Sequence, residues 1–489
     1  MLVDALLQAH RRVPNKLAVD DGLRKLTFRD LARLSFVFKE LVAEVTTCSR
    51  VGIMLPASAV FPSTLMGVLW SGKTAVPLNF LLNADELAKI VEDAGLDAIF
   101  TIGHFRDLVE RLPARPVYLE NLPLKGKMVI ARFRRLAGPP RSDAHSTAVI
   151  LYTSGTTAEP KGVELTHGNL ESNCRDTVHS LNIDAQKTFL NVLPPFHVFG
   201  LTATVLVPVT LGASVFALPR FSPSSVPRLV AEHQVSILMA VPSMYAAILR
   251  TKSAPADAFR SVYLAISGGE PLAEAVRAGF EERFGVTLRE GYGLTETSPV
   301  VSACTATCYR PGSVGRPIRN VKVGIVAPDG RELPAGVDGE IVVSGPGVMK
   351  GYYKKPEETR RVVDADGRFH TGDIGHLSGD GFLSITGRLK EMLIIGGENV
   401  FPREIEAVLE SHDAVLQAAV IGTRDDMRGE SATAFVIPVD GASVSAQELR
   451  SHAKKSLAGF KVPKRIEIRQ DLPQGPTGKI LKRRLQDLL

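Results

Sequence analysis

Cysteine and tryptophan are rare in this sequence, since its 489 residues hold four cysteines and one tryptophan. Cys304 and Cys308 lie four positions apart, but no second pair and no nearby histidine completes a zinc site. Cys48 and Cys174 are scattered, so the spacing gives no disulfide framework. We therefore expect a protein of a reducing compartment, the cytoplasm.

Neither sign of charge dominates, because 58 basic residues stand against 52 acidic ones and leave a net charge of +6. Such a mild excess suits anionic small ligands or an acidic partner better than nucleic acid, which we exclude as a partner. Long clean hydrophobic runs are also absent. The uncharged stretches 51–70 and 201–219 contain prolines and split into a helical and a β-branched part, as buried strand–helix units do. No transmembrane span is predicted, and the segment around Asp4 has no cleavable signal pattern.

The chain is too long for one hydrophobic core, so two or more domains are expected. Up to about residue 145, short apolar strands such as 51–55, 75–78 and 97–101 alternate with amphipathic helices such as 29–42. This alternation predicts a mostly parallel sheet with helices on both faces. Beyond about residue 313, short strands between Asp-Gly and Pro-Gly turns predict a small antiparallel barrel or sheet. The last hundred residues or so read as a compact α+β unit, with helices at 402–411 and 445–457 and strands near 415–421 and 432–437.

Residues 151–162, LYTSGTTAEPKG, are the most informative stretch. They follow an apolar, β-branched strand, and their small hydroxylated residues with Gly155 allow backbone N–H groups to approach an anion. Lys161 adds a point charge suited to a phosphate. The order of residues is not that of a Walker A loop, because Gly162 and Val163 follow the lysine. We predict a triphosphate cradle; a plain Gly/Ser surface turn is the alternative.

Further polar groups are predicted at the carboxyl edge of a parallel sheet, where ligands of open α/β folds bind. The turn 267–272 follows one strand and opens a helix, with Pro271 expected near its first turn. The next strand runs into 290–297, which ends in a Thr-Glu-Thr triplet. His197 lies between two phenylalanines, so a satisfied core side chain and a functional one are both open.

Five motifs occur in order: YTSGTTAEPKG, GYGLTET, HTGD, GRLKEMLIIGGENVFPREIE and PTGKILKRRL. Together they resemble the adenylate-forming superfamily of acyl- and aryl-CoA synthetases, peptide-synthetase adenylation domains and firefly-type luciferases. The resemblance covers nearly the whole chain. It implies an N-terminal domain, 1–387, of two α/β sheets plus a small β-barrel. A hinge at 388–390 and a smaller, mobile α+β domain at 391–489 would complete the fold.

The chemistry that the resemblance implies has two halves. A carboxylate attacks the α-phosphate of ATP, and a thiol then displaces AMP from the acyl-adenylate. Because the carboxylate meets a polyanion, the first half depends on charge neutralisation and alignment. Neither half needs an enzyme nucleophile, and no convincing Ser-His-Asp or Cys-His set is present. The ATP-binding residues implied by the resemblance are Thr153, Ser154, Gly155, Thr156, Thr157, Lys161, Gly269, Glu270, Pro271, Gly291, Tyr292, Thr295, Asp373, Arg388 and Lys479.

The resemblance also assigns roles within this set. Gly269, Glu270 and Pro271 would flank the adenine, and Tyr292 would stack on it. Asp373 would accept hydrogen bonds from the ribose with Arg388 beside it. Oxygen ligands suit Mg²⁺, and the two expected ones are the carboxylate of Glu296 and the hydroxyl of Thr153. The implied catalytic residues are Lys479, Thr295, Glu296 and His197.

Domain rotation would separate the two half-reactions. In the first half Lys479 would swing in from the C-terminal domain to bridge the carboxylate and the α-phosphate. Rotation about Lys390 would then withdraw it and bring Gly396, Gly397 and Glu398 alongside a tunnel for the CoA thiol. His197 would line the boundary between acyl pocket and tunnel.

The expected acyl pocket, from residues around 196–201, 241–245, 267–268 and 298–302, is apolar or small. It offers no cation for a second carboxylate and no acid for an amine, so we predict a medium- or long-chain fatty acid, with an aryl acid as the alternative. CoA is the expected thiol, and an acyl carrier protein is the rival because the basic tail suits either. Peripheral contact with a membrane is compatible with such substrates. A luciferase-like oxygenase and a non-catalytic nucleotide-binding paralogue are the remaining alternatives.

Overall fold

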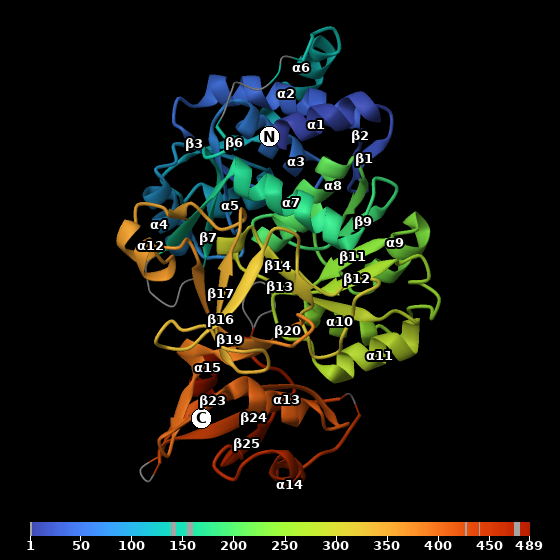
Figure 1. Cartoon of the computed structure of the whole chain (residues 1–489). Coiled ribbons are helices and arrows are strands. Elements are labelled where there is room, and N and C mark those ends of the chain that lie inside the picture. The colour runs from blue at the N-terminus through green and yellow to red at the C-terminus, as the bar shows by residue number, and fades with distance from the viewer. Residues whose placement is uncertain are drawn as a thin grey trace.

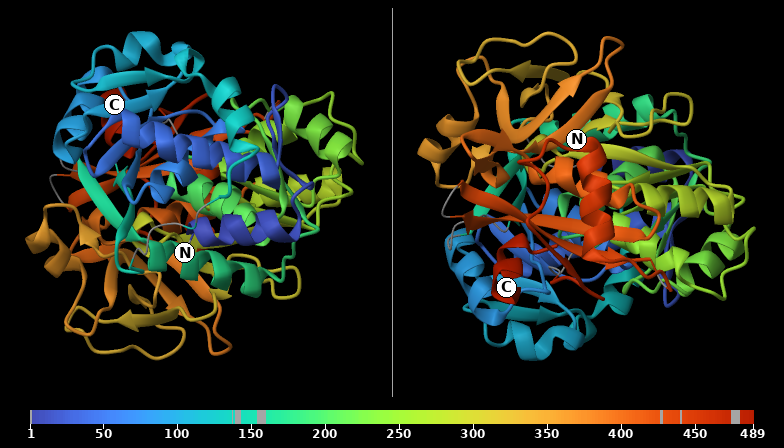
Figure 2. Two further views of the ribbon diagram at one scale, coloured as in Figure 1. Left: turned by 90° about the horizontal axis from the view of Figure 1, so that it is seen from above. Right: turned by 90° about the horizontal axis from the view of Figure 1, so that it is seen from below.

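The computed structural model describes residues 2–136, 138, 143–153, 160–425, 428–439, 441–473 and 480–489. Two large sheets with their helices form the body of the molecule. A smaller C-terminal unit lies below the body in Figure 1, at one end of the molecule. Seen from below, this C-terminal unit covers the junction between the two halves of the body (Figure 2).

A seven-stranded sheet forms the first half of the body. Its central strands are parallel, as predicted, whereas β8 and β18 at one edge run antiparallel to their neighbours. The predicted strands at 51–55, 75–78 and 97–101 are confirmed. In order across the sheet the strands are β18 (Gly351–Tyr352), β8 (Lys161–Thr166), β7 (Thr147–Thr153), β4 (Thr74–Pro77), β3 (Arg50–Met54), β5 (Ala98–Thr101) and β6 (Arg115–Tyr118).

The helices around this sheet follow from their sequences. Thr27 and Asp30 form a capping box at the start of the predicted helix 29–42, which extends a few residues further at each end. The uncharged stretch 51–70 becomes a strand and a helix whose residues are all buried, which explains its lack of polar positions. The helices are α2 (Phe28–Val45), α3 (Val60–Trp70), α4 (Ala84–Ala94), η1 (Gly103–Phe105), α5 (Arg106–Val109), η2 (Leu119–Asn121) and α6 (Leu124–Ala131).

A nine-stranded sheet forms the second half of the body. Its first strands come from the extreme N-terminus, which the sequence pattern did not foresee: Val19 pairs in parallel with Val215. The interior strands are parallel, and the antiparallel pairs lie at the two edges, between β1 and β2 and beyond β13. The order is β15 (Arg316–Pro317), β14 (Val300–Ala303), β13 (Leu288–Gly293), β12 (Leu264–Ser267), β11 (Ile237–Ala240), β9 (Thr188–Asn191), β10 (Ser214–Ala217), β1 (Leu17–Asp20) and β2 (Lys25–Thr27).

One helix on this sheet differs from the prediction. It begins at Glu274 and not near Pro271, because the backbone N–H of Leu272 donates to the Glu290 carboxylate, 3.3 Å away, and keeps the turn extended. The uncharged stretch 201–219 becomes a π-helix, a short α-helix and a strand. In the described part of the chain no helix is long and apolar enough to cross a membrane. The helices are α1 (Leu2–Arg12), α7 (His167–Leu181), η3 (Gly200–Leu206), α8 (Val207–Leu211), α9 (Ser225–His233), α10 (Pro242–Leu249), α11 (Glu274–Phe284) and η4 (Thr295–Thr297).

The small β unit is a four-stranded antiparallel sheet, one of the two forms that its turns predicted. Tyr292 and Val301 of the nine-stranded sheet pack into its apolar core, so the small sheet is attached to the site-bearing edge of the body. Its elements are β16 (Lys322–Val326), β17 (Gly339–Ser344), α12 (Pro356–Val362), β19 (Phe369–Leu377) and β20 (Leu383–Arg388).

The C-terminal unit has a core of its own, centred on residues such as Val400, Ile405, Leu409 and Val436. The helices predicted at 402–411 and 445–457 and the strands predicted near 415–421 and 432–437 are confirmed. The elements are η5 (Leu389–Glu391), β21 (Leu393–Ile395), β22 (Glu398–Val400), α13 (Pro402–Glu410), β23 (Val415–Asp425), β24 (Gly429–Pro438), α14 (Ala446–Ser456), β25 (Arg465–Ile468), α15 (Lys482–Leu485) and η6 (Gln486–Leu488).

Candidate active site

A cleft of about 680 Å³ lies between the carboxyl edge of the nine-stranded sheet and the C-terminal unit. This is the edge at which open α/β sheets bind ligands. The body contributes the turn after β12 and the segments after β9 and β11, and the C-terminal unit closes the cleft with 470–472 and parts of β23. The cleft wall includes Leu193, Pro194, His197, Phe199, Val241, Met244, Arg250, Gly269, Glu270, Pro271, Glu410 and Leu472.

His197 is exposed and lines this cleft, so it is not the core histidine that its phenylalanine neighbours allowed. Its Nδ1 accepts a hydrogen bond of 3.4 Å from the backbone N–H of Phe199. Phe196 is the residue that turns inward, where its ring meets that of Phe80 edge to face at 4.9 Å. The loop therefore presents the imidazole to the cleft and anchors itself through the preceding ring.

The turn after β12 runs very close to its neighbours. A Cβ atom on Gly268 would lie 3.3 Å from the carbonyl oxygen of Gly291 and 3.4 Å from the ring of Phe199. Gly269 adopts a φ of +87°, a left-handed conformation that favours glycine. Small residues here let Gly269, Glu270 and Pro271 reach the cleft wall together.

Tyr292, Asp373 and Arg388 come together on the other side of β13. The Tyr292 hydroxyl donates to Asp373 Oδ2 at 2.6 Å, and Arg388 Nε lies 2.6 Å from Oδ1. Register brings the two charged residues together, since Asp373 on β19 pairs with Arg388 on β20. Asp373 is only 2% exposed. Burial, reinforced by the neighbouring carboxylate, raises the pKa of Tyr292 and keeps its hydroxyl a donor. The residues predicted for adenine and ribose thus form one hydrogen-bonded group, which the motifs alone did not reveal.

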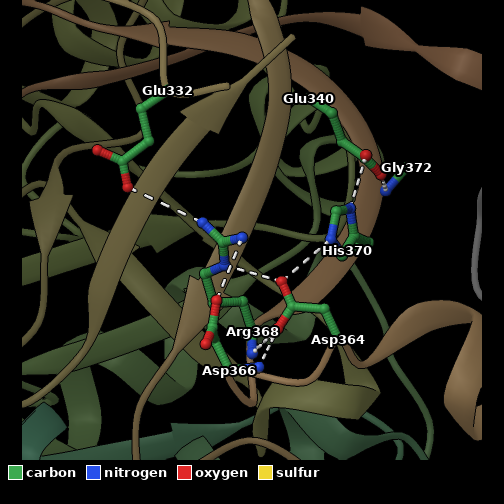
Figure 3. Close-up of polar contacts among 7 residues, drawn as sticks. All are labelled: Glu332, Glu340, Asp364, Asp366, Arg368, His370 and Gly372. Carbon is green, nitrogen blue, oxygen red and sulfur yellow. Dashed lines mark hydrogen bonds and ion pairs between the residues drawn. The ribbon is translucent and has the colours of Figure 1, made fainter. Parts of the chain in front are cut away.

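The residues that precede Asp373 in the HTGD motif are held by polar contacts of their own (Figure 3). His370 Nδ1 lies 2.8 Å from Glu340 Oε2, and the other Glu340 oxygen accepts the Gly372 N–H at 3.1 Å. On its far side the imidazole Nε2 lies 3.5 Å from Asp364 Oδ2. Glu340 therefore fixes both sides of the turn that precedes Asp373, and it is a positioning residue that sequence reasoning missed.

A second layer supports this histidine. Arg368 Nε contacts Asp364 at 2.8 Å, and Asp366 and Glu332 lie 3.8 and 3.9 Å from the same guanidinium (Figure 3). Although burial works in the opposite direction, hydrogen bonds from Arg368 lower the pKa of Asp364. Despite its carboxylates the cluster is no metal centre: within the described ranges no three His, Cys, Asp or Glu side chains are arranged to hold a metal ion.

Lys161 and Glu296 lie on the phosphate-loop side of the site and are linked through Tyr352. The Tyr352 hydroxyl donates to Glu296 Oε1 at 2.9 Å, and the Lys161 ammonium lies 5.6 Å from the centre of the Tyr352 ring. Lys161 also forms an ion pair with Glu358 of α12, and this contact lowers the pKa of that carboxyl group. Sequence reasoning missed Tyr352 and Glu358, because both reach the site only in the folded chain. Tyr352 lies on β18, which pairs with β8, and Glu358 lies on α12 beside Lys161.

The remaining predicted phosphate ligands divide into two groups. Thr153 ends β7 directly opposite Lys161, and Thr295 is buried in the short helix η4 beside Glu296. The backbone N–H of Met349 donates to the Glu296 carbonyl at 2.8 Å and holds that turn in place. The other members of the predicted set lie outside the described residues; they are Ser154, Gly155, Thr156, Thr157 and Lys479.

The predicted hinge and thiol residues lie on the C-terminal side. Lys390 is exposed on the one-turn helix η5 that follows β20. Gly396 and Gly397, at φ values of +64° and +88°, form the turn of the β21–β22 hairpin, with Glu398 exposed beside them. None of these three lines the cleft in the present arrangement, whereas 470–472, the segment just before the lysine-bearing loop, does.

A charge network lies under the cleft in the C-terminal unit. Lys482 Nζ is 2.8 Å from Glu391 and 2.7 Å from Glu406. Burial opposes its charge, but the two carboxylates prevail and raise the pKa of Lys482. Arg403 contacts Glu410 at 2.7 Å on the same helix, α13. Lys482, three residues after Lys479, thus forms an ion pair with Glu391, which follows the predicted hinge residue Lys390.

Glu290 of β13 faces this network from the body. Burial raises its pKa to about 7, although the Leu272 N–H and the nearby charge of Arg403 favour the ionised form. The contact between the two parts continues at Gly387, where a Cβ atom would lie 2.6 Å from the Phe401 ring. The boundary between body and C-terminal unit therefore holds both a titratable carboxyl group and a tightly packed ring.

A two-sheet body, a small antiparallel sheet and a C-terminal unit closing one cleft define the adenylate-forming class. The chain belongs to the AMP-binding enzyme family: the family's sequence pattern matches residues 6–353, and that of the AMP-binding enzyme C-terminal domain matches 404–479.

Two relatives and one solved structure illustrate this membership. A long-chain-fatty-acid–CoA ligase of Bacillus subtilis is 34% identical over 99% of this chain and 94% of its own. A feruloyl-CoA synthase of Amycolatopsis is 35% identical over 96% of both chains. The solved structure of the anthranilate CoA ligase AuaEII with anthranoyl-AMP has 26% identity, a TM-score of 0.92, and covers 100% of this chain and 96% of its own.

Proposed function

We propose that this protein activates a carboxylic acid with ATP to an acyl-adenylate and then transfers the acyl group to CoA, releasing AMP. One observation carries the proposal. The proposed adenine turn, 269–271, and His197 share a cleft with residues 470–472 of the C-terminal unit. These residues precede Lys479 in the sequence by a few positions. A nucleotide and a carboxylic acid would therefore share one cleft, next to the C-terminal unit that carries Lys479.

In the first half-reaction the body binds and orients ATP. Asp373 would accept the ribose hydroxyls, and the Tyr292 and Arg388 contacts hold its carboxylate in place. Lys161 would exchange its ion pair with Glu358 for the more highly charged phosphates, and Lys479 would neutralise the α-phosphate as the acid attacks.

The residues present fit a magnesium ion that arrives with the nucleotide. Glu296 supplies a half-buried carboxylate, its Oε1 already oriented by Tyr352, and Thr153 supplies a hydroxyl at the facing strand end. Mg²⁺ binds through one or two carboxylates and completes its octahedron with phosphate oxygens and water, so a single carboxylate suffices. The ion would supply charge neutralisation at the phosphates.

In the second half-reaction the C-terminal unit would rotate about Lys390. Such a rotation must separate Phe401 from Gly387 and bring the Gly396–Gly397 turn and Glu398 toward the cleft. His197, on the cleft wall, would then lie between the acyl carbonyl and the incoming thiol. CoA is the proposed thiol, and an acyl carrier protein is the competing one.

The proposed acid is a medium- or long-chain fatty acid. Phe199, Val241 and Met244 give the cleft an apolar inner wall, and one curated relative is named for such acids. An aryl acid is the second candidate, supported by the feruloyl-CoA synthase and anthranilate CoA ligase similarities. Arg250, which the sequence-based pocket did not include, lines the exposed mouth of the cleft, where it is suited to the phosphates of CoA. The scarcity of cysteine supports a cytoplasmic location.

The test is trapping of the activated acid. Purified protein with ATP, Mg²⁺ and hydroxylamine is assayed for hydroxamate and pyrophosphate over a panel of acetate, C8 to C16 fatty acids, cinnamate-type acids and amino acids. We expect fatty acids to lead. Absence of hydroxamate from every acid contradicts the function, and aryl acids in the lead select the second candidate. Adding free CoA or holo-carrier protein then separates the two thiols by AMP release.

A further inference from the structure

Helix α6 and the turn after it, residues 124–136, carry the sequence LKGKMVIARFRRL. Five of these residues are basic and none is acidic. The helix lies at the end of the molecule farthest from the C-terminal unit, outside α2 (Figure 1). Nothing in the proposed reaction uses this element, so its composition needs a separate explanation.

Three apolar side chains of this element are exposed to solvent. Phe133 is 88% exposed, and Val129 and Ile130 are each 55% exposed. The inward face is already satisfied: Ala131 is buried, and Leu124 and Met128 pack against the main core. A helix normally buries its apolar stripe. Here a second apolar group remains in solvent on an element that is otherwise docked.

Ion pairs fasten the helix in this orientation. Lys127 Nζ lies 2.5 Å from Glu44, and Arg134 pairs with Glu40, both on α2. Arg33 of α2 also donates to the Arg132 carbonyl at 3.4 Å. The exposed apolar group is therefore presented by a fixed support and not by a frayed end.

Exposed basic residues flank these exposed apolar side chains in the sequence. Lys125, Arg132 and Arg135 are all exposed next to Val129, Ile130 and Phe133 in the sequence, and we call these six residues the α6 surface. Apolar side chains bordered by lysine and arginine match the boundary between the acyl chains and headgroups of an anionic membrane. Three apolar side chains form a patch much smaller than a stable protein–protein interface requires, whereas reversible lipid binding needs only a few.

We propose that the α6 surface docks this protein on an anionic lipid surface, with Phe133 and Ile130 inserted among the headgroups and the cations beside lipid phosphates. Docking through this end leaves the cleft and the C-terminal unit on the far side, free to rotate (Figure 1). The proposal goes beyond the enzymatic function and holds whichever acid the cleft accepts.

The experiment is co-sedimentation of the full chain with sucrose-loaded vesicles. Vesicles of phosphatidylcholine alone are compared with vesicles containing phosphatidylglycerol, at low and high salt. We expect binding to the anionic vesicles only, weakened by salt. Ile130→Ser/Phe133→Ser should reduce partitioning on the order of tenfold or more, because burial of each large apolar side chain contributes roughly that factor. Arg132→Glu/Arg135→Glu should abolish the preference for anionic lipid.

Two control variants match these changes elsewhere on the surface. Val337→Ser/Ile468→Ser removes two exposed apolar side chains from other elements, and Lys454→Glu/Lys455→Glu on α14 changes the net charge by the same amount as the arginine variant. Both controls should bind vesicles as the native chain does. All four variants should retain pyrophosphate release with a water-soluble acid, which shows that they fold.

Three outcomes would overturn the proposal. These are equal binding to neutral vesicles, unchanged binding by both α6 variants, and equal losses in the α14 control. A native chain that elutes as a dimer, while Ile130→Ser/Phe133→Ser elutes as a monomer, would assign the α6 surface to a second copy of the chain instead.

Discussion

The ribose side and the tail side of the site are built differently. On the proposed ribose side, Asp373 is held by Arg388 on the paired strand β20 and by Tyr292 on β13, and Glu340 fixes the turn before it. On the tail side the C-terminal unit meets the body through the packing of Phe401 on Gly387 and charges that face one another across the boundary. A reaction with the two proposed half-steps would use the first wall to hold the nucleotide and would need the second wall to detach.

Removing Lys479 is expected to have the largest effect on the rate of the reaction. Lys479→Ala should slow adenylate formation roughly 100- to 1,000-fold, the cost of losing one well-placed stabilising group in the transition state. Thioester formation from pre-made acyl-adenylate should be largely unchanged. The two half-reactions are measured separately, with Lys454→Ala on α14 as the control. Equal loss in both halves would mean that the lysine is structural.

Breaking the rigid wall is expected to have the next largest effect. Asp373→Ala removes the ribose acceptor and leaves the partly buried Arg388 without its carboxylate, so kcat/KM for ATP should fall about 100-fold. Both half-reactions that involve the adenosine should suffer. Asp338→Ala is the matched control, because Asp338 pairs with His376 at 2.8 Å on the exposed side of the same small sheet. An Asp373 variant with native kcat/KM for ATP would exclude this residue from the nucleotide site.

Loosening the anchored tail should have a smaller effect on catalysis. Lys482→Met leaves Glu391 and Glu406 without their shared cation, which should destabilise the C-terminal unit by about 3 kcal/mol. Adenylate formation should fall by no more than about tenfold, because Lys479 remains. Urea unfolding and pyrophosphate release are the measurements. Lys464→Met, which removes the more exposed pair with Asp425, should change both far less.

The smallest effect is expected at Glu290, on the boundary between the two walls. Its pKa of about 7 lies above the ordinary 4.5, so the folded chain holds the proton more tightly than the unfolded chain. Stability should therefore fall as pH rises from about 4.5 through 7 and remain lower above that range. Between pH 5.5 and 8 this group should contribute about 2 kcal/mol.

Glu290→Gln tests this pH dependence directly. The amide mimics the protonated acid at every pH. The variant should therefore lose the part of the pH dependence of stability that comes from Glu290, and it should be more stable than the native chain at pH 8. Urea titrations at the two pH values provide the comparison. Glu281→Gln on the exposed face of α11 is the control, and an unchanged pH dependence in the Glu290 variant would contradict the raised pKa.

Much of the fold could be predicted from the sequence, because local periodicity reports burial. The strands near 51–55 and 97–101 and the helices near 402–411 and 445–457 follow from alternation and spacing. The pairing of β1 with β10 could not be predicted in this way, since it joins segments far apart in the chain. Periodicity states that a strand is buried but not which sheet contains it.

The candidate site divides in the same manner. Asp373, Arg388 and Glu296 were identified from motifs, and the structure pairs Asp373 with Arg388 and Glu296 with Tyr352. Tyr352 and Glu358 were missed because no motif marks them; they reach Glu296 and Lys161 only through the pairing of β18 with β8. Motifs identify groups whose chemistry is local, and they leave out partners supplied by tertiary packing.

The parallel pairing of Val19 with Val215 has a consequence for synthesis on the ribosome. The first strand made must wait for nearly two hundred further residues before its partner emerges, on the order of 10 to 40 seconds at ordinary elongation rates. During that interval an apolar segment near the N-terminus is a natural target for ribosome-associated chaperones. The nine-stranded sheet therefore closes late in translation, and pauses before codon 215 should increase misfolding of nascent chains.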